Sequence, residues 1–206
     1  MSTLKPDAKA LIIGGSSGMG LATARLLNRH GIAVTLVGRL ADKLTAAKAS
    51  LNPATEVHLV ELDLLNQQAV EAWIATSSEQ HFDFLINAAG TFSPSPFMEH
   101  SAADYDRYAN LNRSTFLITQ AVVKGMQAQH FGRIVNIGSM WARQAIKATP
   151  SSAYSMAKAG LHALTQHLAM ELAADNIRVN AVSPAVVKTP IYEAFINGRI
   201  NAVFLV

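Results

Sequence analysis

Short apolar runs rich in Val and Ile alternate with longer amphipathic stretches along this chain of 206 residues. The short runs have the length and composition of buried parallel strands, and the stretches between them are long enough for helices. Because strand–helix alternation implies right-handed crossovers, the sequence predicts an α/β fold with a doubly wound parallel sheet and helices on both faces. We expect strands at residues 10–13, 33–37, 57–61, 84–87, 133–137 and 178–182, and helices at about 18–30, 41–51, 66–79, 102–129 and 152–174.

The composition is that of a globular domain. Half of the residues are hydrophobic and 15% are charged, which argues against a disordered chain. No linker or internal repeat interrupts the pattern, and the Ser and Pro residues at 93–96 form a loop too short for a domain boundary. We therefore expect one domain over residues 1–206.

The first expected strand leads directly into a glycine-rich segment, and an expected helix follows it. Gly14 permits a tight turn, Gly18 allows the backbone to approach a pyrophosphate, and Gly20 allows the helix to pack closely on the strand. The first amides and the positive end of the helix then hold the phosphates. The segment therefore predicts a dinucleotide site built from Gly14, Ser16, Ser17, Gly18, Met19 and Gly20.

Tyr154 and Lys158 form the second chemically informative feature. Residues four apart lie on one face of a helix, so the ammonium of Lys158 is expected near the phenol of Tyr154. A free phenol has a pKa of about 10 and is a poor base at neutral pH, and a nearby positive charge favours its ionised form. The pair is suited to exchange a proton with a carbonyl or alcohol oxygen.

With these features in this order, residues 9 to about 190 resemble the short-chain dehydrogenase/reductase family, classical type. The resemblance implies a Rossmann-like fold with strand order 3-2-1-4-5-6 and hydride transfer between a nicotinamide cofactor and a small-molecule carbonyl or alcohol. Ile13 and Ala185 depart from the family pattern, which usually has Thr and Gly at these positions. The motifs that carry the resemblance are the Gly-x3-Gly-x-Gly spacing, Asn87-Ala88-Ala89-Gly90, Ser139 with Tyr154 and Lys158, and Asn180, Pro184 and Thr189.

The resemblance also implies a cofactor site at the ends of the strands. Asp63 is expected to accept a hydrogen bond from the adenine amino group. Enzymes that prefer NAD usually have a carboxylate where Gly38 stands, and here Arg39 follows it. Because a guanidinium matches phosphate in geometry and charge, we expect NADP(H) to be favoured over NAD(H). The other cofactor-binding residues implied are Leu64, Asn87, Ala88, Ala89, Gly90, Tyr154, Lys158, Pro184, Val187 and Thr189.

The family's catalytic roles carry over to four residues. Tyr154 is expected to be the acid/base, Ser139 to hydrogen-bond the substrate oxygen, and Lys158 to tune Tyr154 and hold the nicotinamide ribose. The relay asparagine is assigned to Asn112, with Asn110 as the alternative. Trp141 follows Ser139 closely and is a candidate for lining the substrate pocket.

The end of the chain departs from the family, whose members usually add a substrate-covering region and a last strand. We interpret the apolar tail at 195–206 as an edge strand, a scar of truncation or a contact with another chain. An NADP-binding protein without turnover, a sensor or an inactive relative, is therefore the alternative to an enzyme. A homodimer or homotetramer is expected if the family's interface survives the short C-terminus.

Several classes of function are not expected. The chain has no Cys, which excludes thiolate catalysis, and its seven His residues show no metal-ligand spacing, so we expect no metal. A net charge of +3 from scattered basic residues argues against a nucleic-acid partner. No apolar run approaches the roughly 20 residues of a membrane span, and no signal peptide is recognised, so we expect a cytoplasmic protein.

Overall fold

The computed structural model describes residues 5, 7–77, 80–147 and 149–190. Six strands form one sheet in the order β3-β2-β1-β4-β5-β6, and every neighbouring pair is parallel. This is the expected order, and each strand lies within one residue of its predicted bounds. The strands are β1 (Lys9–Ile13), β2 (Ala33–Gly38), β3 (Val57–Glu61), β4 (Phe84–Asn87), β5 (Gly132–Ile137) and β6 (Ile177–Val182).

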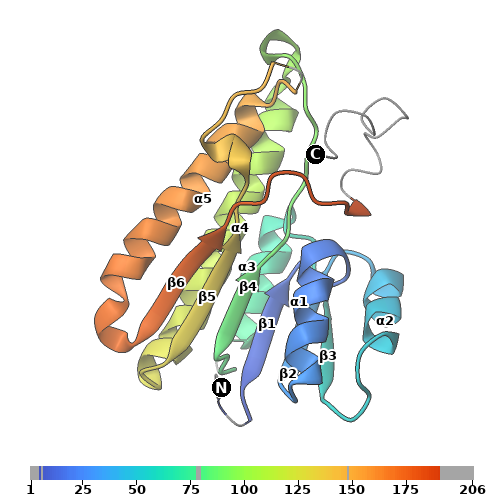
Figure 1. Ribbon diagram of the computed structural model, residues 1–206, viewed down its shortest axis with the longest axis vertical. Coiled ribbons are helices and arrows are strands. Elements are labelled where there is room, and N and C mark those ends of the chain that lie inside the picture. The colour runs from blue at the N-terminus through green and yellow to red at the C-terminus, as the bar shows by residue number, and fades with distance from the viewer. Residues whose placement is uncertain (1–4, 6, 78–79, 148, 191–206) are drawn as a thin grey trace.

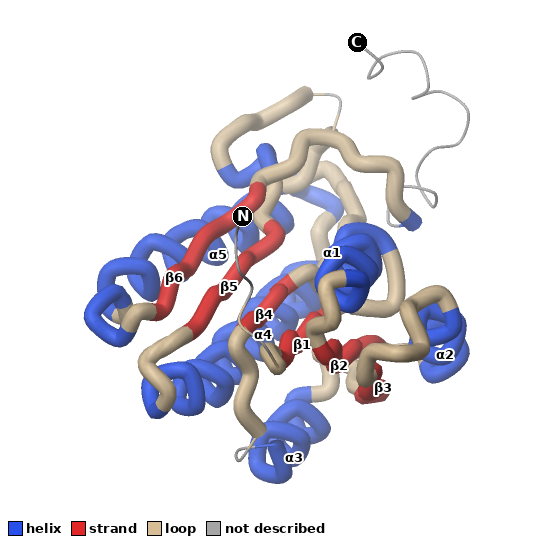
Figure 2. The backbone as a smooth tube through the Cα atoms, turned by 60° about the horizontal axis from the view of Figure 1, so that its bottom comes forward, coloured by secondary structure: helices blue, strands red, loops and turns tan. Residues whose placement is uncertain are grey.

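Helices cover both faces of the sheet, as Figures 1 and 2 show. Successive side chains of β1 point to opposite faces, and both sets are buried. Ile12 packs in the core cluster shared with α1 and α2, whereas Leu11 packs in the cluster shared with α3, α4 and α5. The helices are α1 (Gly18–Arg29), α2 (Ala41–Ala49), α3 (Gln67–Ser77), α4 (Ala102–Ala128) and α5 (Ser152–Glu171), and the short 3-10 turns are η1 (Phe97–Glu99), η2 (Met140–Ala142) and η3 (Ala173–Asp175).

The expected helices are all present, with small differences at their ends. The last one was expected to reach residue 174, but α5 ends at Glu171 and the chain tightens into η3. Asn176 then adopts the left-handed conformation, with φ of 58°, which turns the chain into β6. Residues 78–79 of the third expected helix and the apolar tail at 195–206 lie outside the described residues.

A buried chain of polar side chains ties the middle of the sheet to α4 and α5. The side-chain amide of Asn87 donates to Thr119 at 3.1 Å and to the side-chain oxygen of Asn136 at 2.8 Å. Asn136 in turn donates to the hydroxyl of Thr165 at 2.9 Å. Because buried polar groups are costly unless they are paired, this network holds the carboxyl ends of β4 and β5 in one arrangement.

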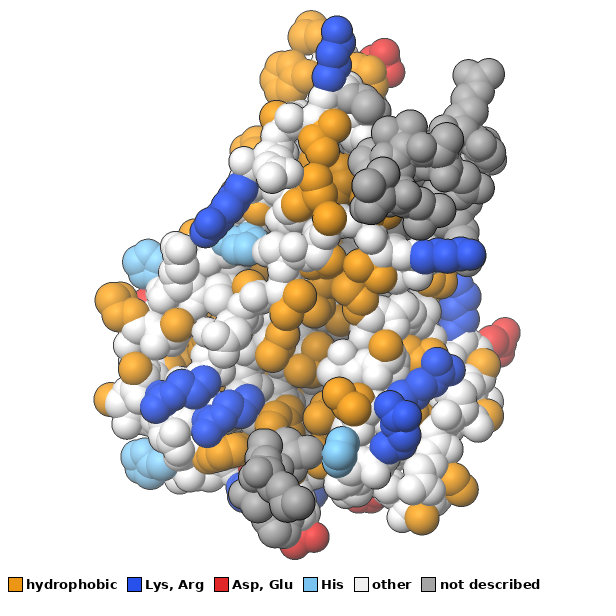
Figure 3. Space-filling model, viewed as in Figure 1, with side chains coloured by type: hydrophobic (Ala, Val, Ile, Leu, Met, Phe, Trp, Pro, Cys, Tyr) orange, Lys and Arg blue, Asp and Glu red, His pale blue; other side chains and the backbone are white. Residues whose placement is uncertain are grey.

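One face of the molecule is partly apolar (Figure 3). Hydrophobic side chains gather along the middle of the face shown in Figure 3, with Lys and Arg side chains on either side of them. Within the described ranges, no helix is both long enough and apolar enough to cross a bilayer.

Candidate active site

The glycine-rich segment forms a tight turn between β1 and α1. The amides of Gly14 and Gly15 donate to the carbonyl oxygen of Val37, at 2.9 and 3.0 Å, and so fix the turn on β2. Gly14 has a φ of +81°, and a Cβ at this position would lie 2.6 Å from the amide nitrogen of Ala89. Gly20 lies directly against the carbonyl oxygen of Gly14, which brings α1 close to β1. Glycine is therefore required here for backbone geometry, as the sequence predicts.

Helix α1 presents its N-terminus to the open end of the sheet. It begins at Gly18, and the side chain of the preceding Ser17 makes no capping hydrogen bond with it. The segment that follows β6 returns across the strand ends to this turn (Figure 1), and Thr189 lies beside Gly18 there. The first-turn amides and the positive helix end are suited to an anionic group.

A cavity of about 560 Å³ lies beside the glycine turn, along the carboxyl ends of β2, β3 and β4. Its volume and its position at the strand ends are those of a nucleotide site in a doubly wound sheet. The glycines that a Cβ would obstruct lie along it, so the residues present suit a dinucleotide. The expected cofactor residues that line this cavity are Gly14, Ser16, Ser17, Gly18, Met19, Arg39, Asp63, Leu64, Ala88, Ala89, Gly90 and Thr189.

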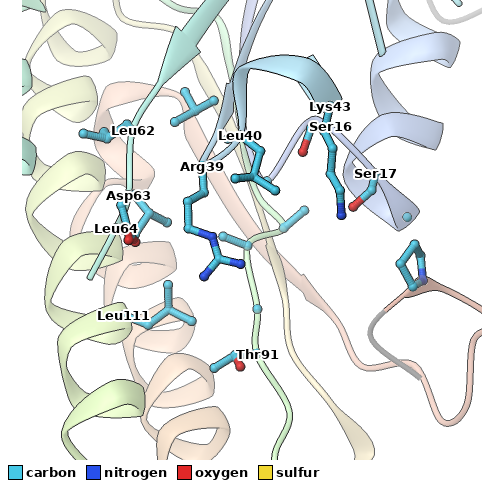
Figure 4. Close-up of a pocket in the computed structure, with 18 of the residues that line it drawn as sticks. Ser16, Ser17, Arg39, Leu40, Lys43, Leu62, Asp63, Leu64, Thr91 and Leu111 are labelled. Carbon is cyan, nitrogen blue, oxygen red and sulfur yellow. The ribbon is translucent and has the colours of Figure 1, made fainter. Parts of the chain in front are cut away.

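The end of β2 shapes one side of this cavity. A Cβ at Gly38 would lie 3.0 Å from the hydroxyl oxygen of Ser16, so a larger side chain would displace that hydroxyl. In Figure 4 the guanidinium of Arg39 points into the cavity, with Asp63 on one side and Ser16 and Lys43 on the other. One carboxylate oxygen of Asp63 accepts from the amide of Leu65 at 3.0 Å. Within the described part of the chain, neither Arg39 nor Lys43 has a salt-bridge partner.

A second, smaller cavity brings together the three residues expected to carry the chemistry. Ser139, at the end of β5, lines it with Tyr154 and Lys158 of α5. Ser139 is 4% exposed, and its side-chain oxygen accepts from the amide of Trp141 at 3.3 Å. The expected residues Pro184 and Val187 complete its other side, and it shares Met19, Ala88, Ala89, Gly90, Thr91 and Thr189 with the larger cavity.

Lys158 is held at a defined place beside Tyr154. Its ammonium donates to the carbonyl oxygen of Ile137 at 2.7 Å and lies 5.8 Å from the ring centroid of Tyr154. Burial lowers the pKa of Lys158 to about 8, because the charged form loses hydration. At mildly alkaline pH, Lys158 can therefore lose its proton more readily than an exposed lysine.

The two candidate asparagines lie in different surroundings. The side-chain amide of Asn112 donates to the carbonyl oxygen of Ala157 at 2.8 Å, and Asn112 lines a third cavity with Tyr154 and Lys158. Asn110 lines none of these three cavities, and its carbonyl oxygen accepts from Gln67. Asn87 also borders the third cavity, although its amide serves the buried network described above.

Some residues of the site were not found from the sequence. Phe92 lines the smaller cavity and packs on the ring of Tyr154, and Tyr108 packs on it from α4. Trp141 is not part of the described lining of this cavity; it is 3% exposed and packs against Phe92, at 5.9 Å between ring centroids. Ala185 does not have a positive φ, so its departure from glycine strains nothing.

A nucleotide-sized cavity that joins a Ser, Tyr and Lys cluster on a doubly wound sheet defines a nicotinamide-dependent oxidoreductase. The family model described as short chain dehydrogenase matches residues 8–199. Since this match spans most of the sequence, the chain belongs to the short-chain dehydrogenase family. It is an oxidoreductase of that family, whose members use NAD(P) and act on CH–OH or C=O groups of small molecules.

Known relatives agree with this assignment. Cyclopentanol dehydrogenase of Comamonas sp. (strain NCIMB 9872) is 34% identical over 202 residues, covering 95% of this chain and 79% of the relative. The structure of L-sorbose reductase from Gluconobacter frateurii, complexed with NADPH and L-sorbose, has a TM-score of 0.85 at 31% identity, covering 93% of this chain and 74% of the other. A short-chain dehydrogenase from Sphingobium yanoikuyae in complex with NADPH also has a TM-score of 0.85 at 31% identity, covering 91% and 74%.

Proposed function

We propose that this chain transfers a hydride between NADP(H) and the carbonyl or alcohol carbon of a small molecule, with Tyr154 as the acid/base. One observation carries the proposal: Ser139, Tyr154 and Lys158 line one cavity, and this cavity shares residues with the larger one at the glycine turn. A reacting carbon at their junction is within reach of both the proton-transfer group and the nucleotide.

The four candidate catalytic residues divide the proton chemistry among them. The bound nicotinamide supplies or accepts the hydride. Tyr154 donates its phenolic proton to a carbonyl oxygen in reduction, or takes the proton of an alcohol in oxidation. The hydroxyl of Ser139 donates a hydrogen bond to the same oxygen. The ammonium of Lys158 favours the phenolate of Tyr154 and binds the nicotinamide ribose, and Asn112 supports proton exchange beside Lys158.

Preference for NADP(H) is part of the proposal. Arg39 lines the nucleotide cavity without a carboxylate partner in the described ranges, and Lys43 lines it as well. Gly38 contributes no negative charge there and leaves room for the hydroxyl of Ser16. These groups form a cationic, hydrogen-bonding end that suits a 2′-phosphate. The NADPH held by two structural relatives supports the same choice.

The proposed substrate is a small carbonyl compound or alcohol that carries no positive charge. In the described lining of the smaller cavity, Lys158 is the only charged side chain. Cyclopentanol and L-sorbose, which appear in the names of two relatives of this chain, are both uncharged and make suitable first probes.

We also propose a homodimer or homotetramer. Phe116 of α4 and Met156 and Met170 of α5 are 48%, 60% and 67% exposed, which leaves apolar surface on two adjacent helices. Such surface commonly marks a protein interface. Light scattering after gel filtration tests this, and a monomer mass at every concentration would contradict it.

The cytoplasmic location stays a prediction.

The proposed function is tested by calorimetric titration with NADPH and with NADH, followed by turnover assays with cyclopentanol and NADP⁺ and with L-sorbose and NADPH. We expect tighter binding of NADPH than of NADH and turnover of at least one probe. Tyr154→Phe should keep the NADPH affinity and lose turnover by about 10²-fold or more, since it removes the acid/base. Unchanged turnover in Tyr154→Phe would refute the mechanism. NADPH binding without turnover of any carbonyl or alcohol tried would favour the nucleotide-binding protein without catalysis.

A further inference from the structure

Two aromatic rings from different elements pack against Tyr154. The ring of Phe92, in the segment after β4, lies 4.9 Å from the ring of Tyr154 between centroids, at an interplanar angle of 69°. The ring of Tyr108, on α4, lies 5.8 Å away at 67°. Both contacts are edge-to-face, the arrangement that the ring quadrupoles favour. Tyr154 is therefore held by side chains outside its own helix.

The hydroxyl of Tyr108 fixes the segment that carries Phe92. It accepts a hydrogen bond from the amide of Ser93 at 2.9 Å and lies 3.3 Å from the carbonyl oxygen of the same residue, to which it donates. Tyr108 is 3% exposed, and Ser93 is partly buried. Since Ser93 directly follows Phe92, one tyrosine controls both aromatic contacts of Tyr154.

The cluster also reaches the serine side of the cavity. Trp141 is 3% exposed and packs against Phe92, and its amide donates to the hydroxyl oxygen of Ser139. Phe92 thus lies at the centre of contacts that extend from Tyr154 to the turn after β5. Because Phe92 lines the smaller cavity, a shift of its segment would change the surroundings of Tyr154 there.

Tyr108 itself is not a second acid/base. Its hydroxyl is engaged by the backbone of Ser93, and burial raises the pKa of Tyr108 above its ordinary value of 10.0. Its phenol therefore stays protonated at mildly alkaline pH, and its hydrogen bonds persist there. This leaves a positional role.

We propose that Tyr108 is a positioning residue, which orients the phenol of Tyr154 through its own ring and, through Ser93, through the ring of Phe92. The proposal rests on the proposed role of Tyr154 as the acid/base. Proton transfer requires the phenol oxygen within hydrogen-bonding distance of the substrate oxygen, and a displacement of about 1 Å can lower a rate about 10²-fold. Tyr108 acts on the rate without contacting substrate.

The experiment compares three variants of the full chain with the wild type. Tyr108→Phe keeps the ring and removes the hydrogen bonds to Ser93, and Tyr108→Leu removes the ring as well. Tyr105→Phe is the matched control, because Tyr105 lies on the same helix and is 49% exposed. We measure kcat and KM with cyclopentanol and NADP⁺ or L-sorbose and NADPH, the calorimetric Kd for NADPH, and the thermal midpoint.

We expect kcat to fall about tenfold in Tyr108→Phe and about 10²-fold in Tyr108→Leu, with the NADPH Kd unchanged within twofold. In a Tyr154→Phe background the Tyr108 substitutions should have no further effect on residual turnover, because the group they position is absent. Equal kcat in wild type and Tyr108→Phe, additive losses in the double variants, or a parallel loss of NADPH affinity would each overturn the proposal. If Tyr154→Phe itself retains full turnover, the proposed function fails first.

A second measurement needs no substrate. Ring-labelled tyrosine NMR, with the signal of Tyr154 assigned by its loss in Tyr154→Phe, reports the surroundings of this ring directly. We expect Tyr108→Phe to shift or broaden the Tyr154 signal and Tyr105→Phe to leave it unchanged. An unshifted Tyr154 signal in Tyr108→Phe would overturn the proposal even if none of the probes is turned over.

Discussion

The ammonium of Lys158 donates a 2.7 Å hydrogen bond to the carbonyl oxygen of Ile137, two residues before Ser139 in the chain. This contact links α5, which carries Tyr154 and Lys158, to the end of β5, which Ser139 follows closely. It also keeps a positive charge in a buried place, which has consequences for pH dependence.

Lys158→Met should change how stability responds to alkaline pH. Burial lowers the pKa of Lys158 from 10.5 to about 8, so the unfolded chain binds more protons than the folded one between these values. For this group, the free energy of unfolding therefore rises by about 3 kcal/mol as the pH is raised from 8 to 10.5. The same increment is lost as the pH falls back to 8. Urea unfolding at pH 8 and at pH 10.5 should show this increment in wild type and in the exposed control Lys124→Met, but not in Lys158→Met. Parallel curves for all three would contradict the buried charge.

Arg39→Ala should distinguish the two nicotinamide cofactors. Loss of charge-assisted hydrogen bonds to a 2′-phosphate should weaken NADPH binding about 10- to 100-fold, and NADH binding should change little. Calorimetric titration of the variant with both cofactors measures this directly. Lys48→Ala, on the exposed side of α2 and outside the cavity, is the control. Equal weakening of both cofactors would remove Arg39 from the phosphate site.

Gly20→Ala should disturb the nucleotide turn. A Cβ there would meet the carbonyl oxygen of Gly14 and would lie 3.3 Å from the Cβ of Ala88, so the helix must move away from β1. We expect a loss of about 2 kcal/mol in the free energy of unfolding and weaker NADPH binding. Gly160→Ala is a contrasting helical substitution, since its nearest neighbour would be Asn112 at 3.7 Å. That variant should be as stable as wild type or more so, because alanine favours helices; equal effects of both substitutions would argue against the close packing at Gly20.

Asn112→Ala and Asn110→Ala should separate the two candidate relay residues. Of these two asparagines, Asn112 borders the third cavity with Tyr154 and Lys158 and donates to the carbonyl oxygen of Ala157 on α5, whereas Asn110 does neither. Removing that amide should lower kcat about tenfold, whereas Asn110→Ala should leave kcat within twofold of wild type. Steady-state kinetics at saturating cofactor decide between them. The reverse order of effects would assign the role to Asn110.

The strands, the helices and the nucleotide turn could all be predicted from the sequence, because each depends on relationships within a few residues. The glycine positions are examples: the positive φ of Gly14 and the approach of Gly20 to the carbonyl oxygen of Gly14, six residues earlier, are both set within the turn itself. Tyr154 and Lys158 were found for a similar reason, since a spacing of four places two side chains on one helix face.

Only the tertiary structure decided which residues surround Tyr154. Phe92 and Tyr108 belong to separate elements, and nothing in their local sequence marks them as neighbours of a third ring on α5. The pairing of Asn87 with Asn136, 49 residues apart, and the position of Asn112 on the third cavity together with Lys158 were likewise beyond local patterns. Periodicity encodes which face of an element is buried, whereas contacts between elements depend on how the crossovers bring those faces together in space.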